Sequence, residues 1–488
     1  MVYLAREMEG SPGRQANVSG FSHLELLLLL GLMIPSTMVL VDSGMLSVAL
    51  PVIQDEFGVS VDLLALVVAA VYVPRVALMP VFGQLGDLFG KKRLYLWGLS
   101  IYTLGAGVGI IATSFPILLL ARLMQGVGAA SIPLAIALIL DSFPRERSGR
   151  ALGTWNSASP LGTLLGPLLG GIVVERLGWH ANFVIVLFFS LLAAFAVWRL
   201  VPAHPVSQPA GYFDWTGAFF LVGAMLALLL ASSTTSVFPL GSPVNVAFWV
   251  VGGLGLLGLA WNALRRPRPL VGFEIFKNPR FLLPSVAVNL RMFAHTGTTF
   301  LLVLYLANVF RMSPSAVGFF TIFYTLALLV GIVYGGTLAD RWPSRKATTL
   351  GLLAQGLGLL GIGWVGTRYG VYGMVPGMLV AGFGAGSCLI SFTKEAVVAL
   401  GDEKVGLASG LYNMLRFAGA TVSAPVLGSL LAAAFLLPGG SPSLAGPYVS
   451  GFRLLALAAG GGLLLARFIP LPVRKSQVEV EEIPEVDV

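Results

Sequence analysis

Charged residues are scarce in this chain of 488 residues. They make up 11% of it, while 56% of the residues are hydrophobic, and soluble domains typically carry about 25% charged residues. Too few charged side chains are present to cover the surface of a soluble protein of this length. Together with a mean hydropathy of +0.87, this composition predicts an integral membrane protein whose surface lies mainly in lipid.

Cysteine and histidine are scarce as well. The single cysteine, Cys388, excludes an intrachain disulfide and a thiolate metal cluster, and the chain has only four histidines. The sequence contains no H-E-x-x-H zinc motif, no G-x-S-x-G nucleophile elbow and no P-loop. We therefore expect no enzyme activity, no metal and no cofactor. A receptor or scaffold derived from a transporter is a further alternative, but such proteins usually carry a sizeable soluble domain, which this sequence lacks.

What the sequence does contain is a series of long apolar runs. A helix needs about 20 apolar residues to cross a bilayer. By this rule the sequence predicts an all-α protein with fourteen transmembrane helices, near 24–50, 62–85, 94–113, 116–140, 149–174, 180–200, 214–234, 244–263, 281–308, 314–338, 347–367, 371–396, 405–434 and 448–469. The first run is too long for the apolar region of a signal peptide, so we expect it to be retained.

The basic residues are distributed unevenly over the predicted loops. With the N-terminus inside, 22 of the 30 Lys and Arg residues fall in inner segments and four fall outside. This split follows the positive-inside rule, and it predicts a multi-pass protein of the cell (inner or plasma) membrane with both termini in the cytoplasm. It also explains the net charge of +8 without any role in binding nucleic acid. The last four basic residues lie within helices: Arg75, Arg122, Arg291 and Arg416.

An internal repeat divides the chain into two related halves. The stretch GQLGDLFGKKR (83–93) ends the second predicted helix, and GGTLADRWPSRK (335–346) ends the tenth. Each places a glycine four residues before an aspartate, Asp87 or Asp340, and follows it with basic residues. The two aspartates are farther apart than one six-helix half requires, which two inserted helices would explain. Repeated halves of this kind build transporters that rock around a site at the membrane midplane.

Four motifs carry a resemblance to a known family. The family's loop motif reads G-x-L-A-D-R-x-G-R-K, and Gly83, Asp87, Gly90, Lys91 and Lys92 match it, whereas Leu88 replaces the usual arginine. LLLARLMQGVGAA (118–130) matches the fourth-helix motif, GTLLGPLLGG (162–171) matches the fifth-helix antiporter motif, and VLVDSGMLSVALP (39–51) is similar to the first-helix motif, with Gly44 for threonine and Ser47 for asparagine. Over about residues 24–470 the chain resembles the major facilitator superfamily, specifically its fourteen-helix drug:proton antiporter branch.

This resemblance implies a major facilitator fold of two six-helix bundles with two additional central helices. The expected divisions are a cytoplasmic N-terminal segment (1–23), an N-terminal bundle (24–200), the inserted helices (201–264), an interfacial linker helix (265–280), a C-terminal bundle (281–470) and a cytoplasmic tail (471–488). The loop and fifth-helix motifs are expected to set the balance between inward- and outward-open states, through Gly83, Asp87, Gly90, Lys91, Lys92, Arg93, Asp340, Arg341, Gly162, Gly166, Pro167, Gly170 and Gly171.

Asp42 lies inside the first apolar run, with no nearby charge in that run to neutralise it. A charged side chain at the centre of a membrane helix costs about 2.5–3.5 kcal/mol on insertion scales, and such residues are usually functional. We expect Asp42 to take up and release the coupled proton, with Arg122, Arg416 and His295 also involved in coupling. Arg75 and Arg122 are candidate partners for the charge of Asp42. Arg416, in the second half, is expected to lie opposite Asp42, with the Asp42 carboxylate or a water-filled cavity as its partner. The expected substrate cavity comprises Asp42, Arg75, Arg291, His295, Asn156 and Trp155.

The resulting prediction is a proton-coupled exporter of amphipathic small molecules such as drugs, acting by alternating access as a monomer in contact with membrane lipids. The helices hold four arginines and one clearly central carboxylate, and this surplus of positive charge keeps open an alternative, the export of an anionic lipid or metabolite. A proton-coupled importer is a further alternative, which the fifth-helix motif disfavours.

Overall fold

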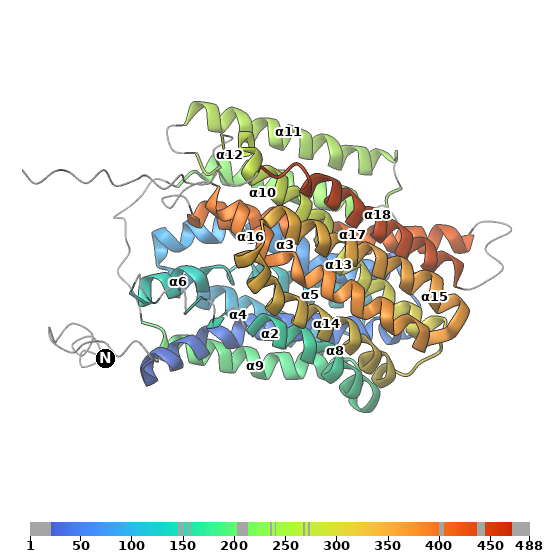
Figure 1. Cartoon of the computed structure of the whole chain (residues 1–488). Helices are drawn as coiled ribbons and strands as arrows, with labels where there is room; N and C mark the ends of the chain where they lie inside the picture. The colour runs from blue at the N-terminus through green and yellow to red at the C-terminus, as the bar shows by residue number, and fades with distance from the viewer. Residues whose placement is uncertain are drawn as a thin grey trace, which may run out of the picture.

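The computed structural model of the chain is helical throughout the part that it describes, and no strand occurs there. Most helices run along one common direction and pack side by side (Figure 1). The described residues are 21–144, 147, 151–152, 154–155, 158–202, 213–234, 237–239, 241–266, 269–271, 274–399, 405–436 and 445–470. The expected terminal segments, 1–23 and 471–488, therefore lie almost wholly outside it.

The first group of helices forms one bundle. Its opening helix starts at a capping box, in which Ser22 Oγ accepts a hydrogen bond from the Glu25 amide and the Glu25 carboxylate accepts one from the Ser22 amide. Gly58, with φ of 60°, ends that helix in a left-handed turn. The bundle contains α2 (His23–Phe57), α3 (Val61–Phe89), α4 (Lys91–Ile110), α5 (Phe115–Ala129), α6 (Leu134–Ser142), α8 (Ala158–Leu177) and α9 (His180–Leu200).

A second bundle repeats this arrangement with the C-terminal helices. Its longest element has a break at Gly370, whose φ of 71° and ψ of −166° are not helical, and this break falls between two of the expected spans. The bundle contains α13 (Pro279–Asn308), α14 (Pro314–Arg341), α15 (Ser344–Ser387), α16 (Leu389–Val398), α17 (Val405–Leu436) and α18 (Gly446–Ala466).

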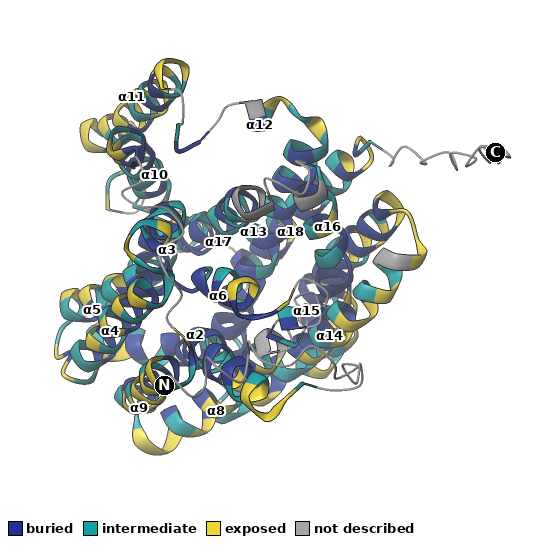
Figure 2. Cartoon of the chain, turned by 90° about the vertical axis from the view of Figure 1, so that its left-hand side faces the viewer, coloured by how far each residue is buried: buried dark blue, intermediate teal, exposed yellow. Residues whose placement is uncertain are grey.

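The inserted pair, α10 (Trp215–Ser233) and α11 (Pro243–Arg265), lies at the periphery (Figure 2). Helix α10 packs against α3 and α17 as well as against α11. Asp214 fixes this pair, because its buried carboxylate accepts hydrogen bonds from Gly217 N, Asn262 Nδ2 and Leu270 N. In the described part of the expected interfacial linker, α12 (Glu274–Lys277) is the one helix that lies wholly within it. The side chains of Leu270 and Val271 are buried in an apolar core.

Eleven helical stretches among the described residues are long and apolar enough to cross a membrane. One of them, Ser344–Ala396, contains the break at Gly370 and so covers two expected spans. Helices α4 and α8 match two further expected spans but are not among the eleven. An all-helical, multi-pass protein is therefore established, while the count of fourteen stays a prediction.

The two bundles meet along two seams, α3 against α17 and α8 against α14. At the end of the molecule that carries the α2–α3 turn, here the Gly58 end, one apolar core contains residues of both bundles, including Leu64, Leu304 and Leu427. At the opposite end, here the Gly90 end, a separate core consists of N-terminal bundle residues only, such as Leu28 and Phe143. A third core follows the α3–α17 seam and also contains residues of both bundles, such as Val76, Phe281 and Leu411.

Candidate functional site

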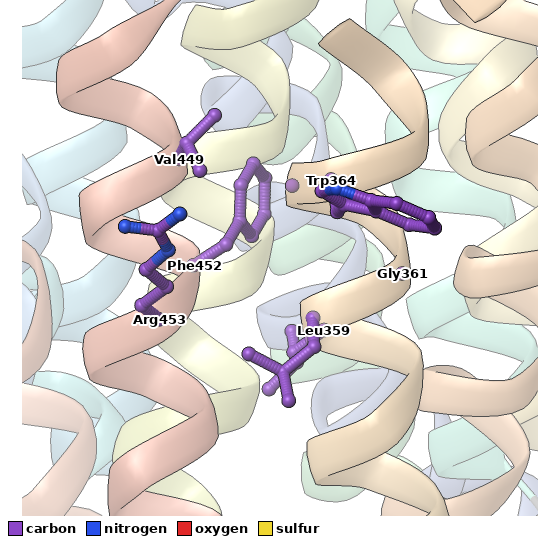
Figure 3. Close-up of a pocket in the computed structure, with 8 residues that line it drawn as sticks. Leu359, Gly361, Trp364, Val449, Phe452 and Arg453 are labelled. Carbon is purple, nitrogen blue, oxygen red and sulfur yellow. The ribbon is translucent and has the colours of Figure 1, made fainter. Parts of the chain in front are cut away.

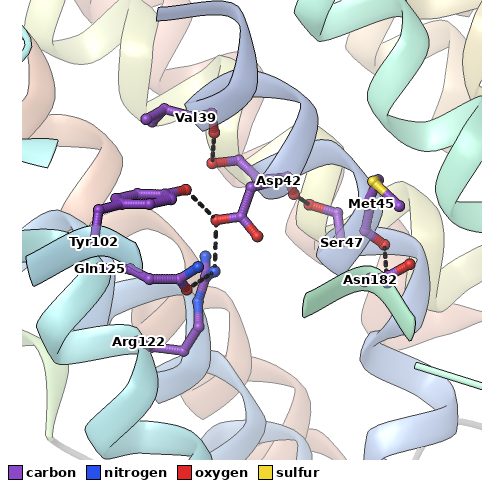
Figure 4. Close-up of polar contacts among 9 residues, drawn as sticks. Val39, Asp42, Met45, Ser47, Tyr102, Arg122, Gln125 and Asn182 are labelled. Atoms are coloured by element: carbon purple, nitrogen blue, oxygen red, sulfur yellow. Dashed lines mark hydrogen bonds and ion pairs between the residues drawn. The ribbon is translucent and has the colours of Figure 1, made fainter. Parts of the chain in front are cut away.

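Asp42 forms a buried ion pair inside the N-terminal bundle. Its Oδ2 atom lies 2.9 Å from Arg122 Nη1 and accepts a second hydrogen bond from the Tyr102 hydroxyl at 2.6 Å (Figure 4). The three residues come from α2, α4 and α5, so three helices converge on one carboxylate. Asp42 is 2% exposed and Arg122 is 3% exposed. The charge that the sequence places in an apolar helix is therefore neutralised by a neighbouring helix.

The ion pair is held by a further amide. Gln125 follows Arg122 by three residues, so the two share a face of α5, and its Oε1 accepts a hydrogen bond from Arg122 Nη1 at 2.6 Å. Arg122 Nε and Gln125 Nε2 are buried without a hydrogen-bond partner in the described part of the chain. Arg122 would thus keep one neutral partner if Asp42 lost its charge.

The expected pairing of Asp42 with Arg416 is not what the structure shows. Asp42 pairs with Arg122 of its own bundle, because α2 and α5 bring the two side chains together. Arg416 lies instead beside Arg75, and the two guanidinium carbons are 5.0 and 4.4 Å from the ring centroid of Phe417. Neither Arg75 nor Arg416 forms an ion pair within the described residues.

Arg291 and His295 both lie on α13, as expected, but their contacts differ. Arg291 is buried and donates hydrogen bonds from Nε and Nη2 to the carbonyl oxygen of Ala385, at 2.9 and 2.6 Å. His295 Nδ1 lies 2.8 Å from the Tyr324 hydroxyl, and the two rings stack. Arg291 thus binds α13 to α15, and His295 joins α13 to α14. Neither residue contacts the Asp42 network directly.

The last two expected cavity residues contribute little to this picture. Trp155 is buried in the apolar core at the Gly90 end, and its indole nitrogen donates to the Leu32 carbonyl at 3.1 Å. The indole nitrogen of Trp155 is therefore used in packing against α2 and is not directed into a cavity. Asn156 lies outside the described residues.

The loop motif at the Gly90 end is a set of contacts between helix ends. Gly90 has φ of 93°, a conformation that glycine adopts readily, and it allows α4 to begin directly after α3. Lys91 Nζ then lies 2.7 Å from Asp141 of α6 and 3.8 Å from Asp87 of α3, while Lys92 Nζ donates to the Trp198 carbonyl at 2.8 Å. Arg93 is exposed. Four elements of the N-terminal bundle are thereby joined at one end.

The other motif residues lie as follows. Gly83 has open space where a side chain would be. In the repeated motif Arg341 is exposed and belongs to α14, and the side chain of Asp340 lies outside the described residues.

The small residues of α8 face two different helices. Cβ atoms added to Gly162, Gly166 and Gly170 would lie within 3 Å of α2 backbone atoms. A Cβ atom on Gly171 would lie 2.6 Å from the Pro314 carbonyl oxygen of α14, and one on Gly318 would lie 2.5 Å from the Pro167 carbonyl oxygen. The motif therefore permits close approach both within the N-terminal bundle and across the seam between the bundles.

One groove of about 330 Å³ lies away from this network. It opens between α15 and α18 on the surface of the C-terminal bundle, where Trp364, Phe452 and Arg453 line it (Figure 3). It contains none of the residues that the sequence nominates.

Four residues near these charged groups were not assigned to a site by the sequence analysis. Tyr102 and Gln125 contact the Asp42–Arg122 pair, and Tyr72 stacks on Phe417 beside Arg75 and Arg416. Tyr102, Tyr72 and Phe417 lie in apolar helices, where an aromatic side chain carries no signal that separates packing from binding. Gln125 belongs to the fourth-helix motif, so its position in that motif was the available signal. The contacts of all four residues depend on helix packing.

Comparisons with known proteins give consistent results. The sequence profile described as Major Facilitator Superfamily matches residues 32–215, 210–424 and 285–485. "Multidrug resistance protein Stp" of Mycobacterium tuberculosis (strain CDC 1551 / Oshkosh) is 30% identical over 398 residues, which cover 81% of this chain and 74% of that protein. "Drug efflux pump JefA" of the same strain is 27% identical over 403 residues, which cover 81% and 78% of the two chains.

A solved structure shares the arrangement of helices. The bacterial homolog of the human lysosomal transporter Spinster, in its inward-facing and unoccupied conformation, superimposes with a TM-score of 0.65 over 92% of this chain and 96% of its own. The two sequences are 18% identical, so this likeness concerns the fold.

Proposed function

The chain belongs to the Major Facilitator Superfamily, and we propose that it is a proton-coupled antiporter that exports amphipathic small molecules by alternating access. One observation carries this proposal: a carboxylate buried at mid-helix, Asp42, is paired with Arg122. Two relatives bear the names of a multidrug resistance protein and a drug efflux pump, which supports the direction and the class of substrate.

The coupling step follows from the chemistry of the ion pair. When Asp42 is ionised, Arg122 and the Tyr102 hydroxyl stabilise it. A proton that binds Asp42 removes its negative charge and breaks the ion pair, since the neutral acid no longer attracts the guanidinium. Arg122 then keeps Gln125 as a neutral partner. A buried charge without a counter-ion is costly, so the charge that remains on Arg122 after proton uptake changes which bundle arrangement is favoured. Return of the proton to the cytoplasm completes the cycle.

The alternation would occur at the two seams between the bundles. The structure has the bundles closed at the Gly58 end, where a Cβ atom on Gly428 of α17 would lie 3.0 Å from the Asp62 Cα atom of α3. Nearby, Glu175 of α8 accepts a hydrogen bond from the Ser315 amide of α14 at 2.9 Å. Opening this end requires both contacts to separate. The positive-inside rule assigns the Gly90 end to the cytoplasm, so the state seen is closed to the outside.

The remaining features complete the proposal. Fourteen spans follow if α4, α8 and the two parts of Ser344–Ala396 cross the membrane along with the other ten helices. We place the protein in the plasma membrane as a monomer with both termini in the cytoplasm. The contacts of Lys91 with Asp87 and Asp141 would stabilise one arrangement of the helix ends. The glycines of α8 would allow α8 and α14 to shift against each other at the seam.

The test is proton movement in proteoliposomes that contain the purified full-length chain and an internal pH dye. A pH gradient is imposed, and ethidium or 1-naphthylacetate is added as substrate. We expect a substrate-dependent proton flux with wild type and with the Asp55→Asn variant, whose exposed side chain lies near the end of the same helix, but not with Asp42→Asn. Equal fluxes in wild type and Asp42→Asn would contradict the proposal, as would the absence of flux with every substrate.

A further inference from the structure

Two arginines, Arg75 and the half-buried Arg416, lie at the seam between the bundles without an acidic partner among the described residues. Arg75 belongs to α3 of the N-terminal bundle and is 7% exposed. Arg416 belongs to α17 of the C-terminal bundle, and the Nε atoms of both side chains are buried without a hydrogen-bond partner within the described residues. Asp42, the carboxylate that the sequence places in the middle of an apolar helix, is already paired with Arg122.

The two guanidinium groups converge on one aromatic ring. The Cζ atom of Arg75 lies 4.4 Å from the centroid of Phe417, and that of Arg416 lies 5.0 Å from it. The two Cζ atoms can therefore be no farther apart than the sum of these distances. The ring of Tyr72 stacks on Phe417 with a centroid distance of 6.2 Å and an interplanar angle of 25°. Two positive charges and two aromatic rings thus share one small region.

A cation–π contact is worth about 0.5–2 kcal/mol, but it supplies no oxygen acceptor to the N–H groups. Arginine stays protonated under all relevant conditions, so neither charge can be removed by loss of a proton. Two like charges held close together also repel each other. An anionic group with two or three oxygen atoms would reduce the repulsion between the two arginines. It would also accept several N–H bonds in the planar geometry that guanidinium prefers.

We propose that Arg75 and Arg416 bind the anionic group of the transported substrate, a carboxylate, sulfonate or phosphate, while Tyr72 and Phe417 contact its aromatic or apolar portion. This inference rests on the proposed transport function and specifies its substrate class. Because one arginine comes from each bundle, the anion would hold the bundles together only in states where α3 and α17 approach at this point.

The experiment measures binding and not transport. Purified full-length protein in detergent is titrated by calorimetry with 1-naphthylacetate and with 1-naphthylacetamide, which share a ring system and differ in charge. We expect wild type to bind the acid at least tenfold more tightly than the amide. In Arg75→Gln and in Arg416→Gln this preference should fall to about twofold or less, with amide binding retained.

Arg453→Gln serves as the matched control, since it removes one arginine from a transmembrane helix at the surface groove between α15 and α18. It should keep the full preference. The wild-type comparison alone decides the matter if a variant does not fold: equal affinity for acid and amide, or no saturable binding of the acid, would overturn the inference. Retained preference in both seam variants, or loss of it in Arg453→Gln, would also overturn it.

This outcome is separable from that of the proposed function. Arginine-dependent binding of the anion without any proton flux in proteoliposomes would leave the anion site standing and refute the antiport. Proton flux driven by ethidium without selective binding of the anion would support the antiport and refute the anion site.

Discussion

The backbones of Gly44 in α2 and Gly166 in α8 are in direct contact. A Cβ atom added to Gly44 would lie 2.8 Å from the Gly166 Cα atom and 2.7 Å from Cδ of Pro167. The first-helix motif that the chain resembles has threonine at this position. The approach of α2 to α8 explains why glycine occupies it here, because a threonine side chain would overlap the facing helix.

This contact gives the first prediction, on stability. Gly44→Ala should lower the thermal unfolding midpoint in detergent, since overpacking of a tight contact costs about 1–3 kcal/mol. Gly107→Ala is the matched control, because Gly107 of α4 has open space at its Cβ position, and alanine there should be neutral or stabilising by about 0.5–1 kcal/mol. Equal midpoints for the two variants would show that the α2–α8 approach is looser than the structure has it.

A second prediction concerns Asp42. Asp42→Asn should fold and bind substrate, because the amide resembles the protonated acid in size and charge, but it should not drive substrate uphill. Counterflow of labelled substrate at equal pH on both sides should remain measurable while accumulation driven by a pH gradient disappears. Gradient-driven accumulation at the wild-type rate would mean that the ion pair with Arg122 is purely structural.

Tyr102 gives a third prediction, on the stability of the ion pair. Its hydroxyl donates to the Asp42 carboxylate at 2.6 Å, and a hydrogen bond to a charged group contributes about 1.5–3 kcal/mol. Tyr102→Phe should therefore lower the thermal unfolding midpoint in detergent. Tyr369→Phe, at an exposed position, should leave the midpoint unchanged. Equal midpoints for the two variants would count against this role of Tyr102.

The closed Gly58 end gives a fourth prediction. Glu175→Gln should weaken the contact with the Ser315 amide at the start of α14, where the helix dipole favours a carboxylate. In an Ala65→Cys background, labelling by a membrane-impermeant maleimide should then be about two- to fivefold faster. Glu56→Gln is the control, because Glu56 accepts its hydrogen bond from Trp179 within the N-terminal bundle. Faster labelling in both variants would indicate general loosening of the fold.

Topology gives the fifth prediction. A cysteine at the exposed Val237, between α10 and α11, should react with the same maleimide in intact cells, whereas one at the exposed Arg345, at the start of α15, should react only after permeabilisation. The native Cys388 is buried and should stay unlabelled in both cases. The reverse pattern would invert the assignment of the Gly90 end to the cytoplasm.

The sequence by itself determined the membrane class, the family and most helix positions. Apolar runs specify where helices cross a bilayer because the backbone must satisfy its own hydrogen bonds there, and four motifs in order were enough to place the chain in the family that the profile match confirms. The sequence also singled out Asp42 and the four intramembrane arginines, since a charge in an apolar run is detectable without knowledge of its neighbours.

The pairing of the charged side chains was decided only by the tertiary structure. Depth along a helix can be read from residue number, but rotation about the helix axis and the choice of neighbouring helix cannot. For this reason the sequence placed Arg416 opposite Asp42, whereas the packing of α2, α4 and α5 gives Asp42 to Arg122 and Tyr102. The same packing leaves Arg75 and Arg416 together at Phe417, because α3 and α17 belong to different bundles and meet only along the seam.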